Sequence, residues 1–148
     1  LSSLTGWSAA GLAIMESKIT AATDAHTVAV REYKNPTIDY KFSASGATSM
    51  SDVSDALVIQ ARQMADSSKV AFKFDLSKIQ ACSEFIELQR LSSAMGIDVW
   101  KWFFAGGEDH VLLATGLDLP GILIGEVVAG AGIQNVPPEV ENSTWRHF

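Results

Sequence analysis

The stretch VAFKFDL, residues 70–76, together with SEFIELQRLSSAM, residues 83–95, indicates the kind of fold that this chain adopts. In the first segment apolar side chains alternate, with Phe72 and Phe74 on one face, and this alternation predicts a β-strand. In the second segment apolar residues recur at helical spacing, which predicts a helix that Gly96 ends. A strand followed by a single helix is the unit of an α+β domain.

Segments with the same two periodicities lie on both sides of this unit. Strands are predicted at residues 110–116 (HVLLATG) and 121–128 (GILIGEVV). One helix is predicted over the small and apolar residues from Ala9 to Met15, ending near Lys18, and another from about Ser54. A short strand is expected just before the second helix.

Two segments carry weaker patterns. Residues 26–36 (HTVAVREYKNP) are interpreted as a strand or loop, because Pro36 discourages an uninterrupted helix across them. Residues 135–148 (NVPPEVENSTWRHF) are interpreted as an irregular tail. No repeat or low-complexity linker divides the sequence. We therefore predict one α+β domain, residues 1–148, in which helices pack on a mixed or mostly antiparallel sheet.

The composition excludes several classes of protein. A chain of 148 residues with 47% apolar and 19% charged residues is typical of a globular domain. Its net charge of −6 predicts no nucleic-acid surface, and no apolar run reaches the roughly 18 residues of a membrane span. The single cysteine, Cys82, rules out an internal disulfide and is expected to be buried in packing. This cysteine usage suits the reducing cytoplasm.

The stretch TSMSDVSDAL, residues 48–57, contains the carboxylates Asp52 and Asp55 at the start of a predicted helix. At this spacing both lie on one side of the first helical turn, where they could share a cation. They could also cap the helix, because Asp and Ser are favoured at helix starts and acidic groups there oppose the positive end of the helix dipole. The residues alone leave both interpretations open.

The stretch GGEDH, residues 106–110, is the second unusual segment. Its two glycines could make room for a ligand. Alternatively, the segment is a turn into a strand, with Glu108 and Asp109 in solvent at the strand's edge. His110 lacks a second ligand at metal-binding spacing, so a solvent-facing or hydrogen-bonding histidine is expected rather than a zinc ligand.

The remaining candidate groups offer less chemistry. Residues 125–133 (GEVVAGAGI) lack the glycine spacing of a dinucleotide-binding loop and are interpreted as a turn. Three isolated histidines and one cysteine give little support to covalent catalysis. The aromatic residues expected in the core or in a subunit interface are Trp100, Trp102, Phe103 and Phe104. Trp145 and Phe148, in the polar tail, could dock that tail or cover a planar ligand.

Five segments, taken in order, carry a resemblance to a known family: GWSAAGLAIM, ATSMSDVSDAL, FAGGEDHVLLATG, LIGEVVAGAGI and the final WRHF. Together they resemble the carboxy-terminal half of the bacterial thiamine-monophosphate kinases, in the aminoimidazole-ribonucleotide-synthetase-like superfamily. The Asp-x-Ser-Asp and Gly-Gly-Glu-Asp elements are the specific ones. The resemblance implies the superfamily's carboxy-terminal α+β fold. It also implies an ATP-dependent kinase that converts thiamine monophosphate into thiamine diphosphate with Mg²⁺.

The resemblance also implies roles for individual residues. Asp52 and Asp55 become magnesium ligands, because transfer of a phosphoryl group between two anions requires neutralisation of charge, and Ser54 becomes a phosphate contact. The implied substrate-binding residues, expected to support position rather than acid–base chemistry, are Gly106, Gly107, Glu108, Asp109, Trp145 and Phe148.

The chain departs from the family pattern at Ala56, where Gly is usual, and at His110 and Val111, where Tyr-Glu is usual. The resemblance further implies an amino-terminal domain, outside these residues, that binds ATP and forms a homodimer. The isolated chain is therefore expected to be inactive. The alternative is a non-catalytic ligand-binding or structural domain that retains this fold.

Overall fold

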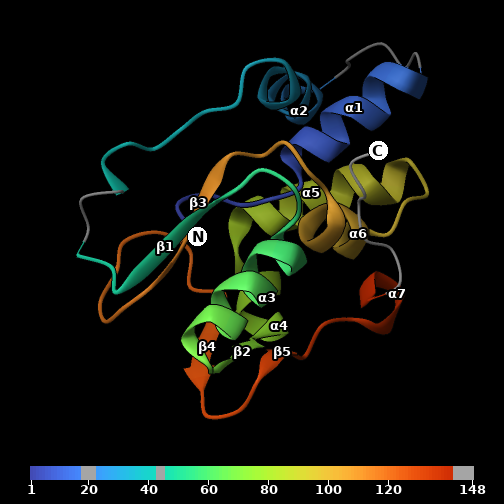
Figure 1. Cartoon of the computed structure of the whole chain (residues 1–148). Coiled ribbons are helices and arrows are strands. Elements are labelled where there is room, and N and C mark those ends of the chain that lie inside the picture. The colour runs from blue at the N-terminus through green and yellow to red at the C-terminus, as the bar shows by residue number, and fades with distance from the viewer. Residues whose placement is uncertain (18–22, 43–45, 142–148) are drawn as a thin grey trace.

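A computed structural model describes residues 1–17, 23–42 and 46–141 of the chain. These residues form an α+β arrangement in which helices pack beside small sheets (Figure 1), as predicted. The helices are α1 (Trp7–Ser17), α2 (Asp24–Lys34), α3 (Leu57–Ser68), α4 (Leu76–Ala81), α5 (Ser83–Ala94), α6 (Val99–Ala105) and α7 (Pro138–Glu141). The strands are β1 (Ser49–Val53), β2 (Ala71–Phe74), β3 (Val111–Thr115), β4 (Gly125–Val128) and β5 (Gly132–Gln134).

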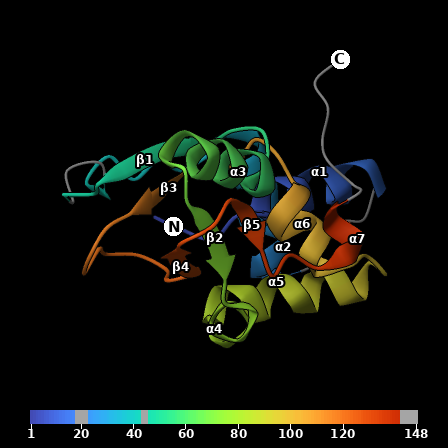
Figure 2. The same ribbon diagram turned by 60° about the horizontal axis from the view of Figure 1, so that its bottom comes forward.

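The strands of the described residues form two sheets. β1 pairs antiparallel with β3, with Val53 opposite Val111. In the second sheet β2 lies in the middle, antiparallel to β4 and parallel to β5. Helix α3 lies across this three-stranded sheet (Figure 2). The pairing is mixed and mostly antiparallel, as predicted, but it is divided between two sheets.

The strand predicted within residues 70–76 is β2, and the helix predicted within residues 83–95 is α5. Phe74 of β2 and Phe85 and Leu88 of α5 are buried, because the apolar positions of each element turn toward a shared core. The sequence analysis missed α4, which lies between them. Asp75 caps α4 by accepting a hydrogen bond from the backbone N–H of Lys78 at 3.1 Å.

Helix α6 supplies the aromatic part of the core. Phe103 and Phe104 are fully buried, and the ring of Phe104 lies edge-on to Phe74 with 4.9 Å between centroids. Trp100 packs against Phe85, with 4.7 Å between ring centroids. The predicted core position of these aromatics is confirmed. The short helix is therefore fixed on the core, and it holds the loop that follows it.

The prediction of a strand or loop at residues 26–36 is wrong, because these residues lie mainly in α2. Thr23 caps the start of this helix, and Pro36 follows its end and so does not interrupt it. The helix packs along α1 (Figure 1) at a close crossing where Ala29 is fully buried. A side chain on Gly11 would overlap the carbonyl oxygen of Ala29. Packing against α1 therefore supports the helix.

The structure also corrects the expected boundaries near residue 54 and in the tail. Helix α3 begins at Leu57 rather than near Ser54, and the preceding residues form β1 and a turn. The stretch expected to be irregular contains the short helix α7, while residues 142–148 lie outside the described residues. Across the described ranges, no helix combines the length and apolar character needed to cross a bilayer.

Candidate functional site

The acid loop, residues 52–55, and the glycine loop, residues 106–109, lie side by side at the end of the β1–β3 pair. The backbone N–H of Glu108 donates a hydrogen bond to the carbonyl oxygen of Ser54 at 2.6 Å. A second bond of 3.0 Å runs from the N–H of His110 to β1. The ladder of two antiparallel strands therefore brings together the two elements that sequence analysis singled out separately.

Both glycines of the glycine loop occupy positions where a side chain would not fit. A Cβ atom on Gly107 would overlap the carbonyl oxygen of Asp55. A Cβ atom on Gly106 would overlap the backbone of Trp102 and the methyl group of Ala9. Gly107 thus allows the two loops to touch, and Gly106 allows α6 to approach α1. Close packing explains this pair of glycines.

Asp109 anchors the glycine loop to the start of α1. It is only 5% exposed, and its two carboxylate oxygens accept hydrogen bonds from the N–H groups of Gly6 at 2.7 Å and Ser8 at 2.9 Å. These donors lie where a helix start leaves backbone N–H groups without helical partners. The expectation that Asp109 lies in solvent at a strand edge is wrong. Its contacts fit a supporting role in the loop.

Burial raises the pKa of Asp109 from 3.8 to about 7, because removal from water disfavours the ionised carboxylate. The hydrogen bonds from Ser8 and Gly6 act in the opposite direction, since they stabilise the ionised form. The negative charge of Glu32 raises the pKa further, and His110 lowers it. Burial outweighs the hydrogen bonds, so the anchor between α1 and the glycine loop titrates near neutral pH.

Glu108 and His110 flank this anchor with backbone φ angles of 65° and 53°. Residues other than glycine rarely adopt such angles, and they are concentrated at functional sites. The two side chains are exposed or half-buried, whereas that of Asp109 points inward. Nε2 of His110 lies 3.4 Å from the carboxylate of Glu108. His110 is thus a partly exposed histidine with an acidic partner, whereas Val111, the next residue, is buried in the core.

The acid loop does not lie on a helix, so the prediction that its carboxylates share and cap a first helical turn is wrong. Asp52 is exposed on β1, and Asp55 is half-buried in the turn before α3. Ala56 occupies the N-cap position of α3, and both it and Leu57 are fully buried. Ala56 has a φ of −161°, which alanine adopts without strain, so its departure from the usual glycine leaves the backbone unaffected.

The carboxylates of the acid loop provide the kind of ligand that Mg²⁺ requires. Within the described ranges no three His, Cys, Asp or Glu side chains form a group that could hold a metal ion. Mg²⁺ is, however, often bound by one or two carboxylates together with waters and substrate phosphates. Asp52 and Asp55 thus supply carboxylates of the kind that such a site uses, whereas the described residues form no closed protein cage.

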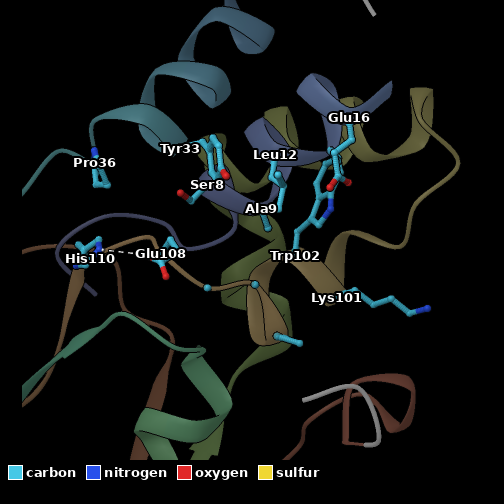
Figure 3. Close-up of a pocket in the computed structure, with 14 residues that line it drawn as sticks. Ser8, Ala9, Leu12, Glu16, Tyr33, Pro36, Lys101, Trp102, Glu108 and His110 are labelled. Atoms are coloured by element: carbon cyan, nitrogen blue, oxygen red, sulfur yellow. Dashed lines mark ion pairs between the residues drawn. The ribbon is translucent and has the colours of Figure 1, made fainter. Parts of the chain in front are cut away.

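A pocket of about 710 Å³ opens beside the glycine loop (Figure 3). We call it the α1 pocket, because Ala9, Leu12 and Ala13 of that helix line it. Tyr33 of α2, Trp102 of α6 and the glycine loop also line it. Its volume lies in the range of small-molecule sites, roughly 300 to 1,000 Å³. Sequence analysis found the glycine loop but missed the helical residues, whose spacing is that of ordinary helix packing.

Two of the predicted substrate residues, Trp145 and Phe148, lie outside the described residues. Cys82 is a half-buried free thiol at the junction of α4 and α5, less buried than expected.

No protein-family model matches the sequence, but the chain is similar to known proteins in sequence and in structure. The thiamine-monophosphate kinase of Corynebacterium glutamicum is 37% identical over 118 residues, which cover 74% of this chain and 34% of the relative. The structure of AaThiL complexed with AMPPCP and TMP is 27% identical, has a TM-score of 0.78, and matches 98% of this chain and 49% of that one. The crystal structure of thiamine monophosphate kinase from Aquifex aeolicus shares the fold, with a TM-score of 0.76, 22% identity and coverage of 99% and 50%.

The chain therefore spans about a third of the curated relative and about half of each solved structure. The sequence similarity and the shared fold agree on the same group of proteins. The predicted α+β class is confirmed, and so is the resemblance of this chain to part of a thiamine-monophosphate kinase.

Proposed function

We propose that this chain is the carboxy-terminal part of an ATP-dependent kinase that phosphorylates thiamine monophosphate to thiamine diphosphate. The observation that carries the proposal is the direct contact between the acid loop and the glycine loop, the two elements most specific to the family. The name of the Corynebacterium relative and the ligands bound to AaThiL support the same reaction.

In this reaction a phosphate oxygen of thiamine monophosphate attacks the γ-phosphorus of ATP. A new P–O bond forms while the bond from that phosphorus to ADP breaks. Because both reactants are anions, catalysis depends on holding them in line and on neutralising their charge. Mg²⁺, held by Asp52 and Asp55, would supply that neutralisation. Ser54, between the two carboxylates, would contact a phosphate.

We assign the substrate side of the site to the glycine loop. Gly106 and Gly107 line the α1 pocket, Gly107 contacts the acid loop, and Glu108 is exposed beside the pocket. Asp109 holds the loop from the inside. Trp145 and Phe148 complete the proposed set of substrate contacts.

The proposed site also needs residues beyond these 148. We propose that ATP binding and the contacts of a homodimer lie in the part of the relatives that this chain does not match. We also propose that the reaction takes place in the cytoplasm. A single domain supplies only part of the shell around metal and nucleotide. We therefore expect the isolated chain to show little kinase activity.

A chimaeric enzyme tests this proposal. The segment of the Corynebacterium kinase that matches this chain is replaced by the chain, and ADP formation is measured with ATP, Mg²⁺ and thiamine monophosphate. We expect turnover by the chimaera and little by the isolated chain. Joint replacement of Asp52 and Asp55 by Asn should abolish turnover. The control is Asp66→Asn, which replaces an exposed carboxylate of α3 and should leave turnover unchanged.

Two outcomes would contradict the kinase proposal. One is a folded chimaera that binds ATP but does not phosphorylate thiamine monophosphate. The other is unchanged turnover after both acid-loop carboxylates are replaced. The first outcome would favour the alternative function, a non-catalytic ligand-binding or structural domain.

A further inference from the structure

A second cavity, of about 760 Å³, is lined by strands of both sheets, and we call it the sheet groove. Its lining includes residues 113–115 of β3, residues 125–127 of β4 and the loop between these strands, residues 116–124. Leu1 also lines it, and both Figure 1 and Figure 2 show the start of the chain between β3 and β4. The sheet groove shares no lining residue with the α1 pocket, so it is a separate feature of the fold.

The first two residues of the chain are hydrogen-bonded to the segments on both sides of them. The amine of Leu1 donates to the carbonyl oxygen of Ile122 at 2.8 Å, and the N–H of Ile122 donates to the carbonyl oxygen of Leu1 at 2.7 Å. Such a reciprocal pair is the hydrogen-bonded pair of an antiparallel ladder. Ser2 donates from its N–H to the carbonyl oxygen of Leu112 in β3 at 2.9 Å, and its hydroxyl oxygen accepts from the N–H of Leu112 at 2.9 Å. The chain start therefore has the backbone pairing of a strand between β3 and the segment that leads into β4.

The nitrogen atom of Leu1 lies in a poor position for a charged group. Leu1 is only 5% exposed, and burial lowers the pKa of its amine from 8.0 to about 6, because removal from water disfavours the charged form. A peptide N–H would donate the same hydrogen bond to Ile122 without carrying a charge. The surroundings of this nitrogen thus favour a peptide bond over a charged amine.

The strands that line the sheet groove leave apolar and polar groups uncovered. Leu117, Leu123 and Val127 line it with exposed fractions of 93%, 61% and 48%. Among the strands of the described ranges, β3 pairs with β1 alone and β4 with β2 alone, so each has a second edge without a strand partner. Native proteins usually protect such edges, and exposed apolar patches mark interaction sites. An extended segment would pair with backbone groups of an edge and cover the apolar side chains at once.

The relatives indicate where such a segment comes from. This chain spans about a third of the Corynebacterium kinase and about half of AaThiL, so both relatives contain polypeptide outside the matched part. A residue joined to Leu1 by a peptide bond begins at the sheet groove, because the nitrogen atom of Leu1 is already bonded to Ile122 there. Polypeptide directly before Leu1 is therefore better placed to cover the groove than any more distant segment.

We propose that the sheet groove holds an extended segment of the polypeptide that precedes Leu1 in the longer protein, and that this segment bridges the β1–β3 sheet and the β4–β2–β5 sheet. The proposal rests on the proposed function in one respect, namely that the chain is the carboxy-terminal part of a longer kinase. The segment would be a strand of about five residues, the usual length. Its apolar residues would alternate, because one face of it packs on the groove.

A chain with an amino-terminal extension tests the proposal. About ten residues, enough for one strand, are added before Leu1, and they are the residues that precede the equivalent position in the Corynebacterium kinase. An extension of Gly and Ser with the same length is the control. Amide hydrogen exchange in β3 and β4, measured by nuclear magnetic resonance, should slow about ten-fold or more in the first extended chain relative to exchange in α5. The reason is that the strands gain partners and their apolar side chains are covered.

Two substitutions in the extended chain locate the contact. Leu123→Asp should abolish the slowing, because it places a charge in the groove, and it should leave the 148-residue chain folded, because Leu123 is exposed there. Ile86→Asp is the matched control. Ile86 is an exposed apolar residue of α5 that does not line the groove, so the slowing should persist in this variant.

Three results would overturn the proposal. The first is equal exchange in the 148-residue chain and both extended chains. The second is slowing that persists in Leu123→Asp. The third is slowing that depends on protein concentration and accompanies dimer formation in sedimentation, which would assign the groove to a second copy of the chain. None of these results bears on phosphoryl transfer, which is measured by turnover of the chimaera.

Discussion

Replacement of Asp109 by Asn tests how the anchor between the glycine loop and α1 works, because Asn keeps the shape of Asp but does not titrate. In the folded chain, burial raises the pKa of Asp109 from 3.8 to about 7. In the unfolded chain this carboxyl group is in water and has its ordinary pKa. The folded state therefore holds the proton of Asp109 more tightly than the unfolded state does.

This difference sets both the sign and the size of the effect. The contribution of Asp109 to stability is complete below a pH of about 4, decreases as the pH rises through about 7, and is constant above that. The two pKa values differ by about three, and each unit corresponds to about 1.4 kcal/mol. The expected loss is thus on the order of 4 kcal/mol. The pKa of Glu32 is lowered, so the contribution of Glu32 to stability is lost as the pH falls. The parent chain and Asp109→Asn both contain Glu32, so its effect is removed when the two are compared.

Urea unfolding of the parent chain and of Asp109→Asn, between a pH of about 4 and about 8, measures this effect. The free energy of unfolding of the parent minus that of the variant should fall with pH by an amount approaching 4 kcal/mol. A constant offset of about 1 to 3 kcal/mol is also expected, because Asn has one acceptor oxygen for the two N–H groups of Gly6 and Ser8.

Asp98→Asn is the matched control. Asp98 caps α6 by accepting a hydrogen bond from the N–H of Trp100 at 3.0 Å, and it is exposed, so its replacement removes a capping carboxylate that is not buried. A difference between parent and Asp109→Asn that stays constant or increases with pH would refute the reasoning. It would mean that the two backbone hydrogen bonds outweigh burial, and that Asp109 is ionised in the folded chain near neutral pH.

Three further substitutions test the packing and the chemistry of the site. Gly107→Ala should separate the acid loop from the glycine loop, reduce stability by about 1 to 3 kcal/mol and weaken thiamine monophosphate binding. Unchanged stability in urea and unchanged affinity would show that the two loops can move apart freely. Gly11→Ala should destabilise the chain in the same assay although Ala favours helices by up to about 1 kcal/mol, and a net gain in stability would show that the crossing at Ala29 relaxes easily. Asp55→Asn in the chimaera should lower turnover and change its Mg²⁺ dependence with little change in stability; a loss of stability with normal turnover would assign Asp55 to folding.

The elements that sequence analysis predicted well are those whose pattern is set by local rules. The alternation in β2 and the helical spacing in α5 follow directly from burial of one face, so their positions agree with the structure. The error at residues 26–36 has a tertiary origin. Helix α2 ends at Lys34, just before Pro36, and rests on a close crossing with α1 that no short stretch of sequence records.

The candidate site was predictable as two separate motifs, but its geometry was not. The pairing of β1 with β3 brings the motifs together, and strand pairing between distant segments cannot be inferred from the period of either strand. The same limit applies to the α1 pocket. Tyr33 and Trp102 belong to helices whose apolar residues mostly pack inside, so their positions on a pocket wall depend on how three helices meet.

The residues of the Gly-Gly-Glu-Asp element have different structural roles. These roles help to explain the effect of His110 and Val111, the two residues after the element that differ from the family pattern. Gly106 and Gly107 allow contact with neighbouring segments, and Asp109 ties the loop to α1. Glu108, and His110 directly after the element, are held at positive φ on either side of that anchor, and both line the pocket. A change at His110 therefore alters the surface that a ligand meets while the loop keeps its anchor. A change at Val111, which is buried opposite Val53, alters the core. The departure at His110 should thus affect ligand preference, and that at Val111 should affect stability.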